Sequence, residues 1–341
     1  MRKYLIVAVV SAWLLLSVVC LLSWLPIVDQ IAFAEPTSTP TLTPTPTNTS
    51  TPTPTPTPTV TPTATPTPTP TPPPLAISLE VDPPAVAQGH TLVIRVRANR
   101  AVTLTGTLDD RALTWAEGSG DYWALLGFTP RSPVGPRTLR VVAVDELGET
   151  VETAATVEVT ATDFPVEQIN LPPDRQALLD PTILKAERER LKPIWGHFGS
   201  ERLWEGVFLV PSEGEVTSAY GTRRSYSGGP PTGYHEGLDL GAAEGTAVVA
   251  GNRGRVTLAE PLQVRGNAVI LDHGWGVQTG YYHLSEIKVQ AEQEVAKGEL
   301  IGLAGSTGLV TGAHLHWDFR VGGINVDPLE WTEREWGMDL E

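Results

Sequence analysis

The sequence predicts a mostly β protein. Beyond residue 75, apolar and polar residues alternate in many short runs, and turns rich in Gly, Pro and Asp separate these runs. Only one short stretch carries the helical period. The predicted parts are an N-terminal membrane or signal segment, a Thr-Pro stalk, an immunoglobulin-like β-sandwich, a connector with a short helix, and a compact antiparallel β domain, at 1–34, 35–74, 75–162, 163–205 and 206–335.

The bulk charge limits the partners of this chain. Its formal net charge is −15, from 39 Asp and Glu against 24 Lys and Arg. Phosphate binding needs concentrated Lys and Arg, so we expect no nucleic acid partner, and broad adhesion to anionic lipid is disfavoured. The single cysteine is Cys20, which rules out an intrachain disulfide. Any metal site must therefore be built from His and carboxylates.

The first residues predict export from the cytoplasm. A basic start, Met1 to Lys3, precedes an uncharged apolar run from Tyr4 to Val28. At about 1.5 Å per residue, that run is long enough to span a bilayer as a helix. Ala32 to Ala34 also fits a small-x-small cleavage site. A cleaved signal and a retained membrane anchor both stay open, and both place the rest of the chain outside the cytoplasm, secreted or anchored at the cell envelope.

The stretch from Pro36 to Pro74 is nearly pure Thr-Pro repeat. It has no apolar groups to bury, so we expect an extended, polyproline-like stalk that acts as a passive linker.

The next part of the chain, 75–162, shows the short alternating strands typical of an immunoglobulin-like sandwich, and we expect it to be a spacer or adhesion module. These strands are Ala76 to Val81, Thr91 to Arg97, Val102 to Leu108, Tyr122 to Phe128, Thr138 to Val144 and Val151 to Val159.

The sequence of the connector, 163–205, predicts one amphipathic helix. Asp180 is its expected N-cap, Pro181 lies in its first turn, and it is expected to end near Pro193. Its apolar face is expected to pack against a neighbouring element.

The sequence of the last domain again predicts strands separated by Gly-containing turns, in a sandwich or barrel. These strands are Thr246 to Ala250, Gly254 to Leu258, Ala268 to Leu271, Val277 to His283, Leu300 to Leu303 and His314 to Val321.

Two histidines on one predicted strand mark a candidate site. Residues two apart in a strand point to the same face, so His314 and His316 are expected to project side by side while Leu315 faces the core. Two parallel imidazoles are costly to bury unless something binds them. Zinc or shared proton chemistry would supply that binding.

A second candidate is the segment His235-Glu236-Gly237-Leu238-Asp239. Its start resembles the helical HExxH zinc motif, but Asp239 stands where the second His of that motif should be, and the helical period is absent. Extended backbone fits better, and residues four apart in a strand also share a face. A third candidate, His283, follows two tyrosines at the end of a predicted strand.

Taken in order, these motifs resemble the lysostaphin-like (LytM-type) zinc metallopeptidase family, which acts on peptidoglycan. The resemblance covers roughly Ser218 to Pro328. The matching segments are Ser218 to Arg223 for S-x-[FY]-G-x-R, His235 to Asp239 for H-x-G-x-D, Gly245 to Ala250 for G-T-x-V-x-A, Tyr282 to Ser285 for the Y-x-H-L-S type, Gly305 to Gly308 with Gly312 to His316 for G-x-T-G and G-x-H-L-H, and Asp327-Pro328 for [ND]-P.

The resemblance implies a zinc metalloendopeptidase with one Zn²⁺, held by His235, Asp239 and His316, and an unliganded catalytic pair, His283 and His314. Two His and one carboxylate leave a fourth position for water, as in catalytic rather than structural zinc sites. One imidazole of the pair would take the proton of the water and the other would stabilise the oxyanion, with His314 favoured as the base. The implied substrates are the stem or cross-bridge peptides of peptidoglycan.

Two other functions stay open at this point. One is a non-catalytic wall-binding or amidase-activating module. Modules of that kind lose zinc ligands, whereas this chain keeps all three expected positions. The other is a secreted peptidase that acts on different glycine-rich proteins.

Overall fold

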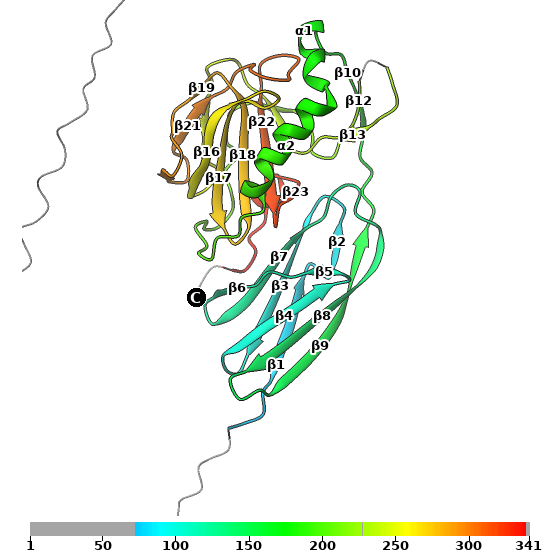
Figure 1. The fold of residues 1–341 in the computed structure, drawn as a ribbon, viewed down its shortest axis with the longest axis vertical. Coiled ribbons are helices and arrows are strands. Elements are labelled where there is room, and N and C mark those ends of the chain that lie inside the picture. Colours follow the sequence, from blue (N-terminus) through cyan, green and yellow to red (C-terminus); the bar gives the residue numbers. More distant parts are fainter. Residues whose placement is uncertain (1–71, 227, 339–341) are drawn as a thin grey trace, which may run out of the picture. The chain divides into compact units, whose positions relative to one another are not determined.

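The structure is a computed structural model that describes residues 72–226 and 228–338, and Figure 1 shows their strands and helices. The described chain is mostly β with predominantly antiparallel sheets, which confirms that part of the fold prediction. The predicted membrane or signal segment, 1–34, and nearly all of the predicted stalk, 35–74, lie outside the described residues. Within the described ranges, no helix has the length and apolar composition needed to cross a membrane.

The first β region consists of two sheets. One has the strand order β1-β3-β7-β6, and the other has the order β2-β9-β8-β4-β5. Its strands are β1 (Ile77–Asp82), β2 (Ala85–Ala87), β3 (Thr91–Ala98), β4 (Val102–Leu108), β5 (Arg111–Ala112), β6 (Ala116–Gly118), β7 (Asp121–Gly127), β8 (Gly135–Asp145) and β9 (Thr150–Thr160).

The core of this region follows from the period of two that the sequence shows. Leu92, Ile94 and Val96 alternate along β3 and are completely buried, in one cluster with Leu139 and Val141 of β8. The six strands predicted here correspond to β1, β3, β4, β7, β8 and β9 within a few residues. The strands β2, β5 and β6 are too short to show a period, so the alternation pattern does not reveal them.

A second β region follows the connector. Its large sheet has the order β11-β14-β22-β18-β17-β16-β20, with β23 paired to β22, and a small sheet has the order β15-β21-β19. The strands are β11 (Glu215–Ser218), β12 (Arg223–Tyr226), β13 (Gly233–Tyr234), β14 (Leu238–Gly241), β15 (Ala247–Val249), β16 (Gly254–Leu262), β17 (Gly266–Gly274), β18 (Val277–Leu284), β19 (Glu286–Ile287), β20 (Glu294–Val295), β21 (Leu300–Leu303), β22 (Leu315–Val321) and β23 (Ile324–Val326).

Strand β22 lies between β14 and β18 in the large sheet. Leu315, Trp317, Phe319 and Val321 alternate along it and are completely buried in the main apolar cluster. Because successive side chains of a strand point to opposite faces, His316 is turned to the other face. The core residues of β22 thereby fix the direction of the histidine.

The connector contains the predicted helix and one strand that the sequence does not reveal. The helix α2 (Pro181–Trp195) begins as expected, since the Asp180 carboxylate accepts a hydrogen bond from the Thr182 amide at 2.7 Å. It runs two residues beyond Pro193, because a proline in the last turn removes only one backbone bond there, and the Gly196 amide donates to the Lys192 carbonyl at 2.9 Å. The other elements of the connector are β10 (Val166–Ile169), α1 (Pro173–Gln176) and η1 (Ala177–Leu179).

The last helix, α3 (Glu330–Glu333), carries a buried carboxyl group. Glu330 Oε2 accepts a hydrogen bond from the Thr91 amide at 2.9 Å. Burial raises the pKa of Glu330 to about 8, while hydrogen bonds from Thr91 act in the opposite direction. The folded protein therefore keeps a proton on this group over a pH range in which an unfolded chain has released it.

We expect this carboxyl group to make the free energy of unfolding fall as the pH rises from about 4.5 to about 8, by up to about 1.4 kcal/mol per pH unit. Glu330→Gln should remove that component and leave the variant more stable than the parent protein above pH 8. Urea unfolding of both proteins across this range measures the difference. Parallel stability curves for the two proteins would contradict the expectation.

Candidate metal centre

Asp239 and His316 are brought together by the pairing of two strands. Strands β14 and β22 are antiparallel, and their register places Asp239 directly opposite His316. Leu238 and Leu240 on either side of Asp239 are buried in the core, so the carboxylate points to the face that His316 occupies. His316 Nδ1 lies 2.7 Å from Asp239 Oδ1.

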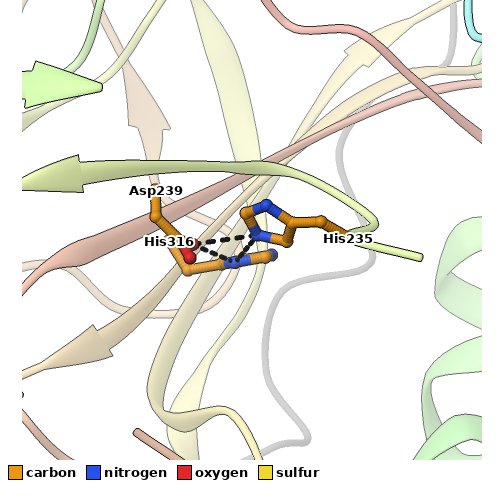
Figure 2. A group of neighbouring side chains, drawn as sticks. All are labelled: His235, Asp239 and His316. Carbon is orange, nitrogen blue, oxygen red and sulfur yellow. Dashed lines mark hydrogen bonds and ion pairs between the residues drawn. The ribbon is translucent and has the colours of Figure 1, made fainter. Parts of the chain in front are cut away.

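His235 joins this pair from the turn between β13 and β14. Its backbone amide donates to the Thr222 carbonyl at 2.7 Å, which fixes the turn. Its Nε2 lies 3.0 Å from Asp239 Oδ1 and 2.9 Å from His316 Nδ1 (Figure 2). The turn requires glycine at position 237, because a Cβ there would lie 2.5 Å from the Trp317 carbonyl oxygen.

The three side chains form a donor set suited to a metal ion. One nitrogen from each histidine and one oxygen of Asp239 all lie within 4.8 Å of one another. Two imidazole nitrogens and a carboxylate oxygen are ligands that Zn²⁺ prefers, and three protein ligands leave a position for a water or substrate. The residues therefore fit a single Zn²⁺. Asp239 and His316 lie on strands and His235 lies in a turn, so no donor lies on the helix of an HExxH motif.

Outer hydrogen bonds hold both imidazoles in one orientation. His235 Nδ1 donates to the Ala219 carbonyl at 3.0 Å, which leaves Nε2 facing the other two donors. His316 Nε2 lies 2.8 Å from Asp318 Oδ1, which leaves Nδ1 facing them. Asp318 is almost completely buried and is also paired with Arg320 at 3.3 Å. Such outer carboxylates fix the ring and raise the basicity of a ligand histidine.

No motif of the sequence singles out Asp318 and Arg320. A signal for them exists, because they continue the two-residue spacing of His314 and His316 along the same strand. Extending the alternation by two more positions would have placed both side chains on the face of the candidate site.

The protonation states of His235, Asp239 and His316 depend on one another. Burial lowers the pKa of His235 to about 4, so this imidazole is neutral and ready to coordinate. Burial alone would raise the pKa of Asp239, but His235 and His316 hold it well below its ordinary value. Burial would also lower the pKa of His316, but the carboxylates of Asp239 and Asp318 outweigh it and raise that pKa to about 9. A proton on His316 neutralises part of the negative charge of the Asp239 and Asp318 carboxylates, and a bound cation would take over that role.

The other two candidate histidines form a pair beside the metal donors. The ring centroids of His283 and His314 lie 4.9 Å apart, and His314 Nε2 is 3.7 Å from Asp239 Oδ1. Their Nδ1 atoms lie 2.8 Å from the Thr307 carbonyl and 2.9 Å from the Gly312 carbonyl, respectively. Since a carbonyl only accepts, each Nδ1 carries the hydrogen and each Nε2 presents a lone pair.

His283 is held in an uncommon backbone conformation. Its φ is +64°, in the left-handed region of backbone conformation that residues other than glycine rarely adopt. Burial together with the rings of His314 and His316 holds its pKa well below the ordinary value. Burial also lowers the pKa of His314, against the opposing effect of Asp239. Both rings are therefore neutral and able to accept a proton.

Two cavities meet at the candidate centre. One has a volume of about 280 Å³ and is lined by His314 and Asp239 together with Ile169 and Leu171 of the connector. The other has a volume of about 320 Å³ and is lined by His235 together with residues of η1 and α2. Arg224, Tyr226, His283, Leu309 and His316 line both. The centre is thus reached from two sides, and the connector contributes to the wall of each.

Comparison with known proteins points to one family. Residues 233–328 match Peptidase family M23. The chain is 36% identical over 123 residues to the peptidoglycan DD-endopeptidase ShyA of Vibrio cholerae, a match that covers 36% of this chain and 29% of that protein. It is 45% identical over 95 residues to the DD-carboxypeptidase/endopeptidase Mpg of Neisseria meningitidis, covering 28% of this chain and 22% of that protein.

A structural comparison extends beyond the matched domain. A crystal structure from Pseudomonas aeruginosa that is assigned to peptidase M23 superposes with a TM-score of 0.53 at 22% identity, and covers 72% of this chain and 94% of that one. At this identity the likeness concerns the fold alone. The chain spans less than a third of the length of the curated relatives it matches.

Proposed function

Since residues 233–328 form a peptidase family M23 domain, which confirms the resemblance found in the motifs, we propose that this protein is a zinc metalloendopeptidase. Its proposed substrates are the stem or cross-bridge peptides of peptidoglycan. The observation that carries the proposal is the convergence of His235, Asp239 and His316 within 4.8 Å, with two further imidazoles beside them. The relatives ShyA and Mpg, named as endopeptidases, support the reaction class.

In the proposed mechanism, the ion would be held by His235, Asp239 and His316. When bound, zinc polarises the scissile carbonyl and lowers the pKa of a water molecule towards neutrality. We assign proton transfer to His314, because its Nε2 lies near Asp239 and its side chain is still 16% exposed to the cleft. His314 takes the proton of the water and returns it to the leaving amine.

His283 is assigned to the developing oxyanion. Its ring lies against His314 at 4.9 Å and is fixed by the bond from Nδ1 to the Thr307 carbonyl. It can donate to an oxyanion only with a second proton at Nε2. In this role it takes that proton from solvent as negative charge approaches and keeps it throughout the step, while the proton of the attacking water goes to His314. Because the ring is held rigidly at a strained backbone position, it needs little rearrangement when the oxyanion forms.

We also propose an extracytoplasmic location, secreted or membrane-anchored, because peptidoglycan lies outside the cytoplasm. The apolar run of Tyr4 to Val28 after a basic start supports export. Residues 35–74 would be the linker, and residues 75–162 an immunoglobulin-like spacer, supported by its two sheets around one apolar core.

Digestion of purified peptidoglycan by the full chain tests the proposed function. We expect mass spectrometry to show released fragments that differ by hydrolysis of one kind of peptide bond. A chelator should stop their release, and added zinc should restore it. Absence of fragments with retained binding to the wall would overturn the peptidase proposal in favour of a non-catalytic module. Cleavage of glycine-rich proteins but not of peptidoglycan would overturn the substrate class.

A further inference from the structure

The connector supplies a strand to the sheet beside the metal centre. Strand β10 pairs in parallel with β12 over four residues, from Val166 opposite Arg223 to Ile169 opposite Tyr226. This strand lies outside the region that matches the peptidase family, residues 233–328, and outside the motifs of the sequence. It places one carboxylate, that of Glu167, within reach of the residues that orient the metal donors.

Glu167 is linked to His235 through one hydroxyl group. Ser218 Oγ donates to Glu167 Oε2 at 2.8 Å and lies 3.2 Å from His235 Nδ1. A hydroxyl has one hydrogen and two lone pairs, and an ionised carboxylate can only accept. Since the hydrogen of Ser218 is directed to Glu167, the hydroxyl can meet His235 Nδ1 only as an acceptor. The imidazole hydrogen at Nδ1 then points to both Ser218 Oγ and the Ala219 carbonyl, which lies at 3.0 Å, and Nε2 is left free for the ion.

Arg224 connects the same hydroxyl to the carboxylate donor. Its Nη2 donates to Asp239 Oδ2 at 2.7 Å and to Ser218 Oγ at 3.5 Å. Asp239 Oδ1 is the atom that faces His235 and His316. With Oδ2 occupied by Arg224, Asp239 presents a single oxygen to the site. The five side chains of this network therefore satisfy one another in only one pattern of hydrogens; they are Glu167, Ser218, Arg224, His235 and Asp239.

We propose that Glu167 is a positioning residue of the metal centre. It acts through Ser218 to reinforce the tautomer of His235, which the Ala219 carbonyl also favours, and to support the orientation of Arg224 and Asp239. The functional unit then begins in the connector and not at residue 206. The inference rests on the zinc site of the proposed function, but it does not depend on which bond is hydrolysed.

The test is the zinc affinity of the full chain, measured by competition with a chromophoric chelator. Partners of this kind affect metal affinity by about 10- to 100-fold, so Glu167→Ala should weaken zinc binding by about tenfold or more. Glu167→Gln keeps an acceptor oxygen for Ser218 and should recover most of the affinity. Because Glu167 acts through Ser218, the double variant with Ser218→Ala should lose no more affinity than Ser218→Ala alone.

Gln168→Ala provides the matched control. Gln168 is the neighbouring residue of β10, and its Oε1 accepts a hydrogen bond from Ser225 Oγ at 2.9 Å, so it ties β10 to β12 without contact to a metal donor. Its zinc affinity should equal that of the parent protein. Thermal unfolding of the metal-free variants verifies that each is folded.

The outcomes separate this inference from the proposed function. Parent affinity in Glu167→Ala, or an equal loss in Gln168→Ala, would overturn the positioning role while zinc binding by the parent protein stands. Additive losses in the double variant would overturn the route through Ser218. A parent protein that binds no zinc would overturn the zinc site and this inference with it.

Discussion

His316→Ala is expected to abolish zinc binding and peptide hydrolysis together. The imidazole contacts both of the other donors, since its Nδ1 faces Asp239 at 2.7 Å and His235 at 2.9 Å. Its loss leaves two donors and removes the hydrogen-bond partner of Asp318 Oδ1, which is buried. Zinc content should fall from about one ion per chain to background, and turnover to the level of the chelated protein.

Metal analysis and peptidoglycan digestion of the same preparation measure both effects. His197→Ala is a suitable control, because that side chain is 58% exposed and its charged partner is Asp272 at 3.5 Å, outside the candidate centre. The control should keep its zinc and its activity. A His316→Ala protein that carries one zinc per chain and digests peptidoglycan normally would refute the assignment of this residue as a ligand.

His314→Ala is expected to separate the two properties. The residue stands beside the donors, with Nε2 at 3.7 Å from Asp239 Oδ1, but the three donors converge without it. Its ring is held by the Gly312 carbonyl and not by a metal ligand. The variant should keep about one zinc per chain and lose turnover by about 10²- to 10⁴-fold, the usual contribution of a general base.

Kinetics with a soluble peptidoglycan peptide distinguish this loss from weaker binding. A general base acts in the transition state, so kcat should fall while KM changes little. Loss of zinc from His314→Ala would make the residue a ligand instead. Full turnover would remove it from the mechanism altogether.

The strand pattern could be predicted because it arises from local alternation. The burial of Leu315, Trp317, Phe319 and Val321 on one face of β22 is visible in the sequence as a period of two. The same period places His316 on the opposite face. The spacing of the motifs then indicated which distant residues belong with it, and the pairing of β14 with β22 brings Asp239 opposite this histidine.

Non-local contacts are the part that the sequence did not reveal. Nothing in the four residues of β10 predicts that they pair with β12, because each of them pairs with a residue that lies 57 positions further along the chain. The link from Glu167 to Ser218 crosses 51 residues and has no motif. The helix α2 ends at Trp195, two residues beyond Pro193, because a proline in the last turn of a helix disrupts only that turn.

The most direct test of the metal centre is anomalous diffraction at the zinc edge from crystals of the zinc-loaded protein. We expect one peak, at about 2.0–2.2 Å from His235 Nε2, Asp239 Oδ1 and His316 Nδ1, with no fourth protein ligand. A peak elsewhere, or a fourth side chain that closes the coordination sphere, would contradict a catalytic zinc at this site.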